Sequence, residues 1–246
     1  MIKFFRNIRK QTISENRFSK YLLYAIGEIV LVVIGILIAL QINNWNERQK
    51  IEAVQETYLE QLLLDIKSDR AYYAATIAQL QQVAQGYENY KTLFEKPNLE
   101  PTTVLSALQQ IDYGSVEVEF STNTFQTLVS TGDIKILPEH LRTELTSYFG
   151  KQTHIKAVSS NNNEGANNIL QKASSIANPD MFGRLRNQPK LQSYLNIQSN
   201  FPQLILELEA YMLWKQIGEN VIIESFQELQ QDATELIELI TAELEA

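Results

Sequence analysis

The longest apolar run of the chain lies near its start. Residues 21–42, YLLYAIGEIVLVVIGILIALQI, contain only one acidic or basic residue, Glu28. A helix of this length spans roughly 30 Å, about the thickness of the hydrocarbon core of a bilayer. A cleaved signal peptide has a shorter apolar region and a small-x-small cleavage site, whereas this run ends in ALQINNW. The pattern therefore predicts an uncleaved transmembrane helix over 21–42.

Aromatic residues flank this run and argue against a second alternative, the buried core helix of a soluble protein. Tyr21 and Tyr24 lie at one end of the run and Trp45 lies at the other. Amphipathic rings prefer the interface between membrane and water. Their placement favours a membrane span.

Beyond the run, apolar residues keep a helical spacing. Over residues 73–87 they recur at intervals of 4, 3, 4 and 3, a heptad-like, coiled-coil-like stripe within a helix predicted over 47–95. No glycine or proline interrupts residues 46–84, so we expect the transmembrane helix to continue directly into this helix. A similar stripe predicts a last helix over 201–246, in which either Trp214 or Lys215 follows Tyr211 on the inward face. Two such stripes cannot both face water, and an antiparallel pair is the simplest arrangement.

The middle of the chain predicts shorter elements. A short helix is expected over 102–111, and SVEVEF over 115–120 alternates with a period of two, which is typical of an extended segment. Turn residues then predict a helix from Ser121 or Thr122 to Ser130, a left-handed Gly132, and a helix that Pro138 opens and that continues through Tyr148 toward Ala173. The predicted fold class is all-α, a single N-terminal transmembrane helix that continues into a bundle of about five helices.

Charge predicts the orientation of the membrane helix. Residues 1–20 carry six basic side chains and one acidic side chain, a net charge of +5, whereas the whole chain carries −8. Lysine and arginine stay on the cytoplasmic side of a membrane. We therefore predict a basic cytoplasmic segment over 1–20 and a periplasmic α-helical domain over 43–246, in the inner (cytoplasmic) membrane of a bacterium. Because the domain is acidic and would repel a polyanion, nucleic acid is not expected as a partner.

The basic segment is also a candidate for contact with lipid. Apolar residues such as Ile2, Phe5 and Ile8 recur beside its basic residues at helical spacing, as in helices that lie in the headgroup layer. A disordered basic tail that only sets the orientation is the alternative. The side chains expected to contact headgroups of the lipid bilayer are Arg6, Arg9, Lys10, Arg17 and Lys20.

Glu28 is the unusual residue of the predicted membrane helix. It lies roughly 6 Å from the middle of the run, where a carboxylate costs on the order of 2.5–3.5 kcal/mol. It shares a helix face with Gly35, and Gly35 with Ala39 forms a small-xxx-small pair that lets two helices approach closely. We predict a seam of these three residues, hydrogen-bonded through Glu28, with a second copy or another membrane protein. A lone glutamate that reaches toward the cytoplasmic headgroups is the alternative.

Two stretches of sequence resemble a known family. RFSKYLLYAIGEIVLVVIGILIALQINNWNE, over 17–47, resembles the N-terminal signature of an uncharacterised membrane-anchored family of Bacteroidota, domain of unknown function 6090. FQTLVSTGDIKIL and the following LRTELTSYF are similar to the second motif of that family, a short helix, a turn with Ser/Thr-Gly and a further helix. The resemblance implies a Gram-negative inner-membrane protein with a helical periplasmic domain. It implies no activity and no catalytic residue.

Composition argues against several classes of chemistry. The chain has no cysteine and only two histidines, His140 and His154, neither within an HExxH pattern. Thiolate, disulfide and histidine-rich metal sites are therefore not expected. Walker, GxGxxG and GxSxG motifs are also absent. We predict no catalytic residue, no metal site and no cofactor.

Three groups of charged residues remain as candidates, and each has a plainer explanation. His140 and Glu144 lie four residues apart on a predicted helix, where a surface ion pair or a solvated face is usual. Glu117 and Glu119 share one face of the extended segment and are expected to be solvated acids. The third group could receive an anion or offset the acidic bundle, and consists of Arg184, Arg186 and Lys190.

The function predicted from these features is non-enzymatic. A single-pass anchor would present a periplasmic helical domain for protein contacts or scaffolding, as a homo-oligomer or with another membrane or periplasmic protein. The alternative is a periplasmic module that senses a small-molecule ligand of unknown identity. Since 20 cytoplasmic residues are too few for an output domain, such a sensor would act through a partner membrane protein. A hydrolytic enzyme is a distant third possibility.

Overall fold

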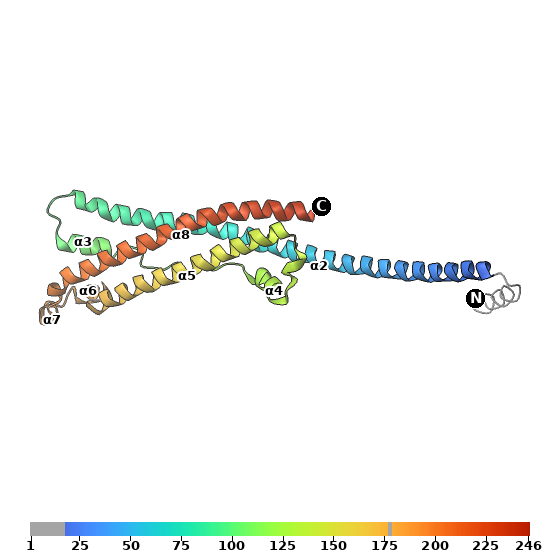
Figure 1. Cartoon of the computed structure of the whole chain (residues 1–246). Coiled ribbons are helices and arrows are strands. Elements are labelled where there is room, and N and C mark those ends of the chain that lie inside the picture. Colours follow the sequence, from blue (N-terminus) through green and yellow to red (C-terminus); the bar gives the residue numbers. More distant parts are fainter. Residues whose placement is uncertain (1–17, 177–178) are drawn as a thin grey trace. The chain divides into compact units, whose positions relative to one another are not determined.

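The computed structural model of the chain describes residues 18–176 and 179–246, and all regular structure in these residues is helical (Figure 1). The predicted all-α class is therefore confirmed. The α-helices are α2 (Phe18–Lys91), α3 (Pro101–Leu108), α4 (Asn123–Thr131), α5 (Glu139–Ile176), α6 (Pro179–Leu185), α7 (Pro189–Leu195) and α8 (Phe201–Leu244), with short 3-10 helices η1 (Thr92–Glu95), η2 (Asp133–Ile136) and η3 (Ile197–Asn200).

The described part of the chain after residue 43 has seven helices rather than the five predicted. The two additional ones, α6 and α7, lie where ANPD and NQPK punctuate the sequence. Each begins at a proline, which has no N–H to lose in the first turn of a helix. The prolines thus start new helices in a segment that the pattern had marked only as a connection.

The chain divides into two compact units, residues 1–57 and residues 58–246, and α2 contributes to both. In the first unit, every described side chain over 22–42 is exposed except the half-buried Ala25. A helix that is apolar on all sides and covered by nothing in its own chain is not stable in water. It is long and apolar enough to cross a membrane.

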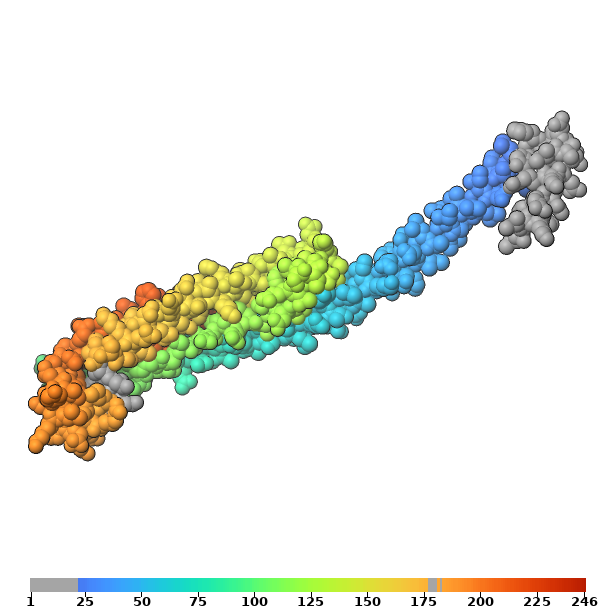
Figure 2. Space-filling model, turned by 90° about the horizontal axis from the view of Figure 1, so that it is seen from below, coloured from blue at the N-terminus to red at the C-terminus, as the bar shows by residue number. Residues whose placement is uncertain are grey.

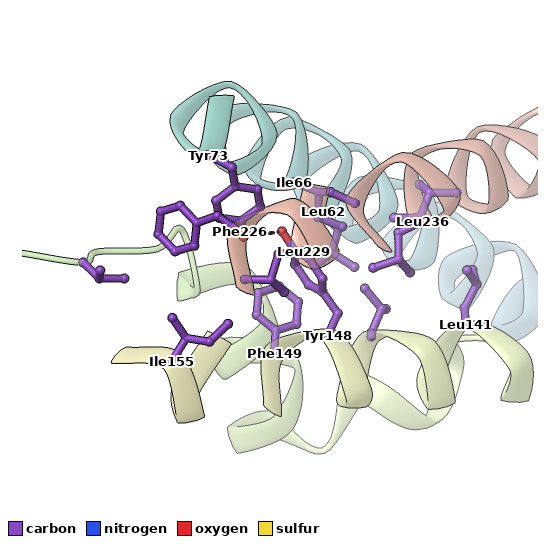
Figure 3. Packing of buried hydrophobic residues seen from close by; sticks show 14 of the residues in the cluster. Leu62, Ile66, Tyr73, Leu141, Tyr148, Phe149, Ile155, Phe226, Leu229 and Leu236 are labelled. Carbon is purple, nitrogen blue, oxygen red and sulfur yellow. Dashed lines mark hydrogen bonds between the residues drawn. The ribbon is translucent and has the colours of Figure 1, made fainter. Parts of the chain in front are cut away.

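The core of the second unit is formed by side chains of α2, α4, α5 and α8. Tyr73 of α2 packs against Phe226 of α8 with ring centroids 5.0 Å apart, and Phe149 of α5 stacks on Phe125 of α4 at 4.2 Å. Figure 3 shows Tyr73, Phe226 and Tyr148 converging from the three long helices. A second apolar cluster joins the end of α2 with α3, α5 and α8. The long stripes seen in the sequence are therefore the buried faces of the long helices.

Polar contacts give the chain direction of these helices. Between α5 and α8, Lys151 pairs with Asp232 at 2.6 Å and Lys172 pairs with Glu207 at 2.5 Å, so contacts on the two helices run in opposite chain order. Contacts between α2 and α8 also run in opposite chain order. Tyr73 packs against Phe226, whereas Tyr90, later in α2, donates a hydrogen bond to Glu209, earlier in α8.

Residues 112–122 connect α3 to α4 without helical structure and pair with no strand in the described residues. Figure 2 shows this green part of the chain along the face between α2 (cyan) and α5 (yellow). The period of two in the sequence is visible in the burial, since Val118 is buried while Glu117 and Glu119 are exposed. We call residues 112–122 the extended segment.

The turn residues act largely as predicted. Gly132 ends α4 with a left-handed φ of 79°, and α5 begins at Glu139 directly after Pro138. The cap of α4 is Thr122, one of the two residues predicted for this position. Its side chain makes no capping hydrogen bond, because its backbone is already helical.

The packing predicts that Leu62→Ala lowers the free energy of unfolding by about 2–5 kcal/mol, because it leaves a cavity in the core. Leu62 is completely buried, whereas Leu64 on the same helix is 68% exposed. Leu64→Ala is therefore the matched control and should change stability by less than about 0.5 kcal/mol. Urea denaturation of both variants, followed by circular dichroism, measures the difference, and equal losses would contradict this packing.

Candidate functional site

The predicted membrane seam lies on an open surface of α2. Glu28, Gly35 and Ala39 are all exposed, and a Cβ added at Gly35 would meet no other atom within 4 Å. No described part of the chain therefore uses the close approach that Gly35 permits. Contact with a second helix stays a prediction.

The predicted lipid-contact residues fall almost entirely outside the described structure. Arg6, Arg9, Lys10 and Arg17 lie in residues 1–17, which are not among the described residues. Lys20 belongs to the first turn of α2, but its side chain is likewise not described. The role of all five in headgroup binding stays a prediction.

A surface that the sequence pattern did not single out lies on the first half of α8. Every exposed residue over 202–221 is uncharged, and the apolar ones recur at helical spacing. We call this surface the uncharged face of α8, and it consists of Leu206, Ala210, Leu213, Trp214, Ile217 and Val221. An apolar groove of about 530 Å³ adjoins it, lined by Phe94, Met212 and Leu213 among others. The exposed positions after residue 223 are instead rich in glutamate, including Glu224, Glu228, Glu235 and Glu238.

The charged residues of the same half of α8 all have inward partners. Glu207 is buried and pairs with Lys172, and Glu209 accepts a hydrogen bond from Tyr90. Lys215 is 7% exposed and donates to the main-chain carbonyls of Asp112, at 3.1 Å, and Gly114. The sequence left the inward position open between Trp214 and Lys215, and the structure buries Lys215. The hydrogen-bond partners of Lys215 come from the extended segment, whose position depends on the fold. The apolar stripe alone could therefore not decide between Trp214 and Lys215.

Glu219, one turn beyond Lys215, is buried beside it. Its carboxylate lies 3.4 Å from the ammonium of Lys215. Burial raises the pKa of Glu219, and the nearby Lys215 acts in the opposite direction. Lys215 thus joins α8 to the start of the extended segment, and Glu219 provides its countercharge one turn further along the same helix.

A second polar group holds the other end of the extended segment. The carboxylate of Asp69 accepts a hydrogen bond from the main-chain N–H of Ser121 at 2.9 Å and one from the amide of Gln152 at 2.7 Å. The same amide reaches the hydroxyl of Tyr73, which in turn bonds to Tyr148 at 2.8 Å. Burial raises the pKa of Asp69, while the hydrogen bonds from Ser121 and Gln152 act to lower it.

The other charged candidates from the sequence are exposed in the structure. His140 and Glu144 are exposed beside the ion pair of Lys151 and Asp232 and line a groove of about 350 Å³. Arg184 and Arg186 are exposed on or just after α6. Lys190 lies in α7 and is also exposed. Among the described residues no group of three or more His, Asp or Glu is arranged to hold a metal ion.

Glu117 and Glu119 do line a common space, as their shared face predicted. The space is a polar groove of about 540 Å³ between the extended segment and one face of α5. Lys156 of α5 lies in the same lining. No local pattern in the sequence marks this groove, because it requires the extended segment to lie against α5, which follows α4 in the chain.

Comparison with known proteins identifies one match. Residues 28–177 match a family described as a family of unknown function (DUF6090). The matched range includes most of α2, the extended segment and α5, and it ends before α6, α7 and α8. No curated protein and no solved structure matches the chain.

The buried carboxylate predicts that Asp69→Asn changes how stability depends on pH. Above its raised pKa, charged Asp69 opposes folding because it has lost water, and below its ordinary value of 3.8 both states are protonated and the effect vanishes. The stability of the variant relative to the wild type should therefore increase as the pH rises from 3.8 through the raised pKa, and then level off. Thermal melting of both proteins across this range measures it, and a relative stability that decreases with pH would contradict the assignment.

Proposed function

The chain belongs to the DUF6090 family, and we propose that it is a single-pass inner-membrane protein whose periplasmic helical domain binds a second copy of itself. The proposed domain is an antiparallel bundle of α2, α5 and α8, and its role is contact or scaffolding rather than catalysis. The observation that carries the proposal is the uncharged face of α8, which exposes large apolar side chains beside an apolar groove. Such patches mark sites of protein contact on soluble domains.

The anchor and its orientation rest on two separate arguments. The exposed apolar residues over 22–42 require a non-aqueous solvent, and a bilayer provides one of matching thickness. The net charge of +5 over residues 1–20 supports a cytoplasmic N-terminus. Under this proposal the acidic domain lies in the periplasm.

Charge favours a second copy as the partner. The domain is acidic, since the whole chain carries −8 although residues 1–20 carry +5, so two copies repel each other on average. At the uncharged face of α8 two copies can meet without like charges in contact, and depletion of charge is typical of interface cores. Helices that cross there at roughly 50° keep the glutamates beyond residue 223 of the two copies apart. Two copies in one membrane also meet at a raised effective concentration.

The small Ala210 in the centre of the face supports close helix packing. It lies between Leu206 and Leu213, which are 64% and 60% exposed. Burial of two such leucine side chains from each copy contributes about 1.5–3 kcal/mol per side chain. This is enough for a specific contact between molecules already confined to one membrane.

Self-association predicts that Leu213→Arg converts the full-length protein from dimer to monomer in mild detergent. A buried arginine without a partner at the centre of an interface costs several kcal/mol, so a loss of affinity of at least about 100-fold is expected. Sedimentation velocity measures the change. Leu64→Arg is the matched control, because Leu64 is equally exposed but lies on α2 in the second unit, away from this face.

Two outcomes of the same assay would reject the uncharged face. One is a wild type that sediments as a monomer at all concentrations. The other is a dimer that survives Leu213→Arg but dissociates with Glu28→Leu, which would transfer the contact to the membrane seam with Gly35 and Ala39.

The orientation is tested separately with alkaline phosphatase fused after Ala246, an enzyme that becomes active only after export to the periplasm. The proposal predicts full phosphatase activity for this fusion and none for a fusion in which the enzyme is inserted after Lys20 with the rest of the chain retained behind it. Replacing the six basic residues of 1–20 by glutamine should reduce the exported fraction. Activity of the early fusion alone would show the opposite orientation.

A further inference from the structure

The polar groove beside α5 has the character of a binding site that the proposed function does not use. One wall is the exposed side of the extended segment, at Glu117, Val118 and Glu119. The other wall is a continuous face of α5, whose lining residues recur at helical spacing over 156–171. At about 540 Å³ the groove is large enough for several residues of a peptide.

The face of α5 in this groove consists almost entirely of amides and hydroxyls. Asn163, Asn167, Asn168 and Gln171 contribute four side-chain amides, and three of them are exposed. Each amide offers both donors and an acceptor, as a peptide bond does. An extended peptide laid along α5 could therefore be matched at successive peptide bonds.

The opposite wall has main-chain groups without partners. No hydrogen bond within the described residues involves the peptide groups of Val118 or Glu119. By contrast, the carbonyl of Val116 accepts from Asn163 of α5 and that of Glu117 accepts from Tyr72 of α2, so two long helices hold the segment in place. A fixed extended segment with free peptide groups is the template on which another extended chain adds as a strand.

Ser159 gives an independent indication of a ligand. Its side chain is 1% exposed, lies in the lining of the groove, and its hydroxyl has no hydrogen-bond partner among the described residues. An unsatisfied buried hydroxyl is costly, and most have a partner in folded proteins. A ligand group in the groove would satisfy it.

We propose that this groove binds an extended, positively charged segment of another polypeptide. Positive charge follows from the lining, in which the carboxylates of Glu117, Glu119 and Glu164 outnumber the single ammonium of Lys156. A polysaccharide fits less well, because no aromatic ring is among these described lining residues to pack against a sugar face. The added strand would pair with the peptide groups of Val118, which share an edge of the extended segment with the carbonyl of Val116, and would take hydrogen bonds from the amides of α5.

The test uses the full-length protein in a non-ionic detergent and a fluorescein-labelled octapeptide of alternating lysine and threonine. Threonine favours the extended conformation, and lysine matches the acidic rim. Fluorescence anisotropy should rise with protein concentration and saturate, with a matched glutamate-threonine peptide at least about tenfold weaker. Empty detergent micelles are the blank.

Variants locate the binding. The double variant Asn167→Ala/Gln171→Ala removes two exposed hydrogen-bonding groups and should weaken binding about tenfold, since two bonds contribute roughly 1.4 kcal/mol together. Asn161→Ala is the matched control, because Asn161 is an exposed asparagine of α5 outside the groove. Leu213→Arg should bind the peptide as the wild type does, which separates this proposal from self-association.

Ser159→Ala distinguishes a ligand-binding role from a structural one. It should weaken peptide binding at least threefold while raising the melting temperature of the free protein, because an unsatisfied hydroxyl is removed. Higher stability with unchanged affinity would assign Ser159 no role in binding. The proposal is overturned if neither peptide gives saturable binding, if the double variant equals Asn161→Ala, or if chitotriose binds and the peptides do not.

Discussion

This fold depends on one constraint. The extended segment lies against the helices but is not helical, and its peptide groups need hydrogen-bond partners. A helix satisfies its own main chain, and a strand uses a neighbouring strand, but the extended segment has neither. Its carbonyls and N–H groups are bound instead by side chains of the three long helices. These are Asp69 and Tyr72 of α2, Asn163 of α5, and Tyr211 and Lys215 of α8. These hydrogen bonds explain why polar residues are buried in the second unit, and they link its three long helices through the extended segment.

This constraint explains what could and could not be predicted from the sequence. The helices with strong apolar stripes were predicted within a few residues, and Gly132 and Pro138 marked their turns, because these features act locally. The burial of Lys215 in place of Trp214 was not predictable, since its partners are carbonyls more than 100 residues away in the chain. The polar groove was missed for the same reason. Local patterns report which face of a helix is buried, but not which main-chain groups that face must bind.

The groove follows from the same arrangement. Side chains of α5 and α2 bind the extended segment at Val116 and Glu117, whereas no hydrogen bond among the described residues involves the peptide groups of Val118 and Glu119. The face of α5 opposite is polar because its asparagines must contact this segment and water rather than apolar neighbours. Both walls lie within the range 28–177 that matches the family, whereas the uncharged face of α8 lies beyond it. The two proposed contacts therefore rest on different parts of the chain and are separable by mutation.

The first half of α8 differs from a usual surface helix in where its charged residues lie. Its charged side chains point inward, where Glu207, Lys215 and Glu219 have partners, and its large apolar side chains point outward. A surface helix normally places charge outward, because each charge loses hydration when it is buried. Here the extended segment and α5 provide the partners of the inward charges, and Leu213 and Ile217 lie on the exposed side of the helix. Water solvates such a face poorly, and under the proposed self-association the same uncharged face of a second copy would cover it without burying a charge.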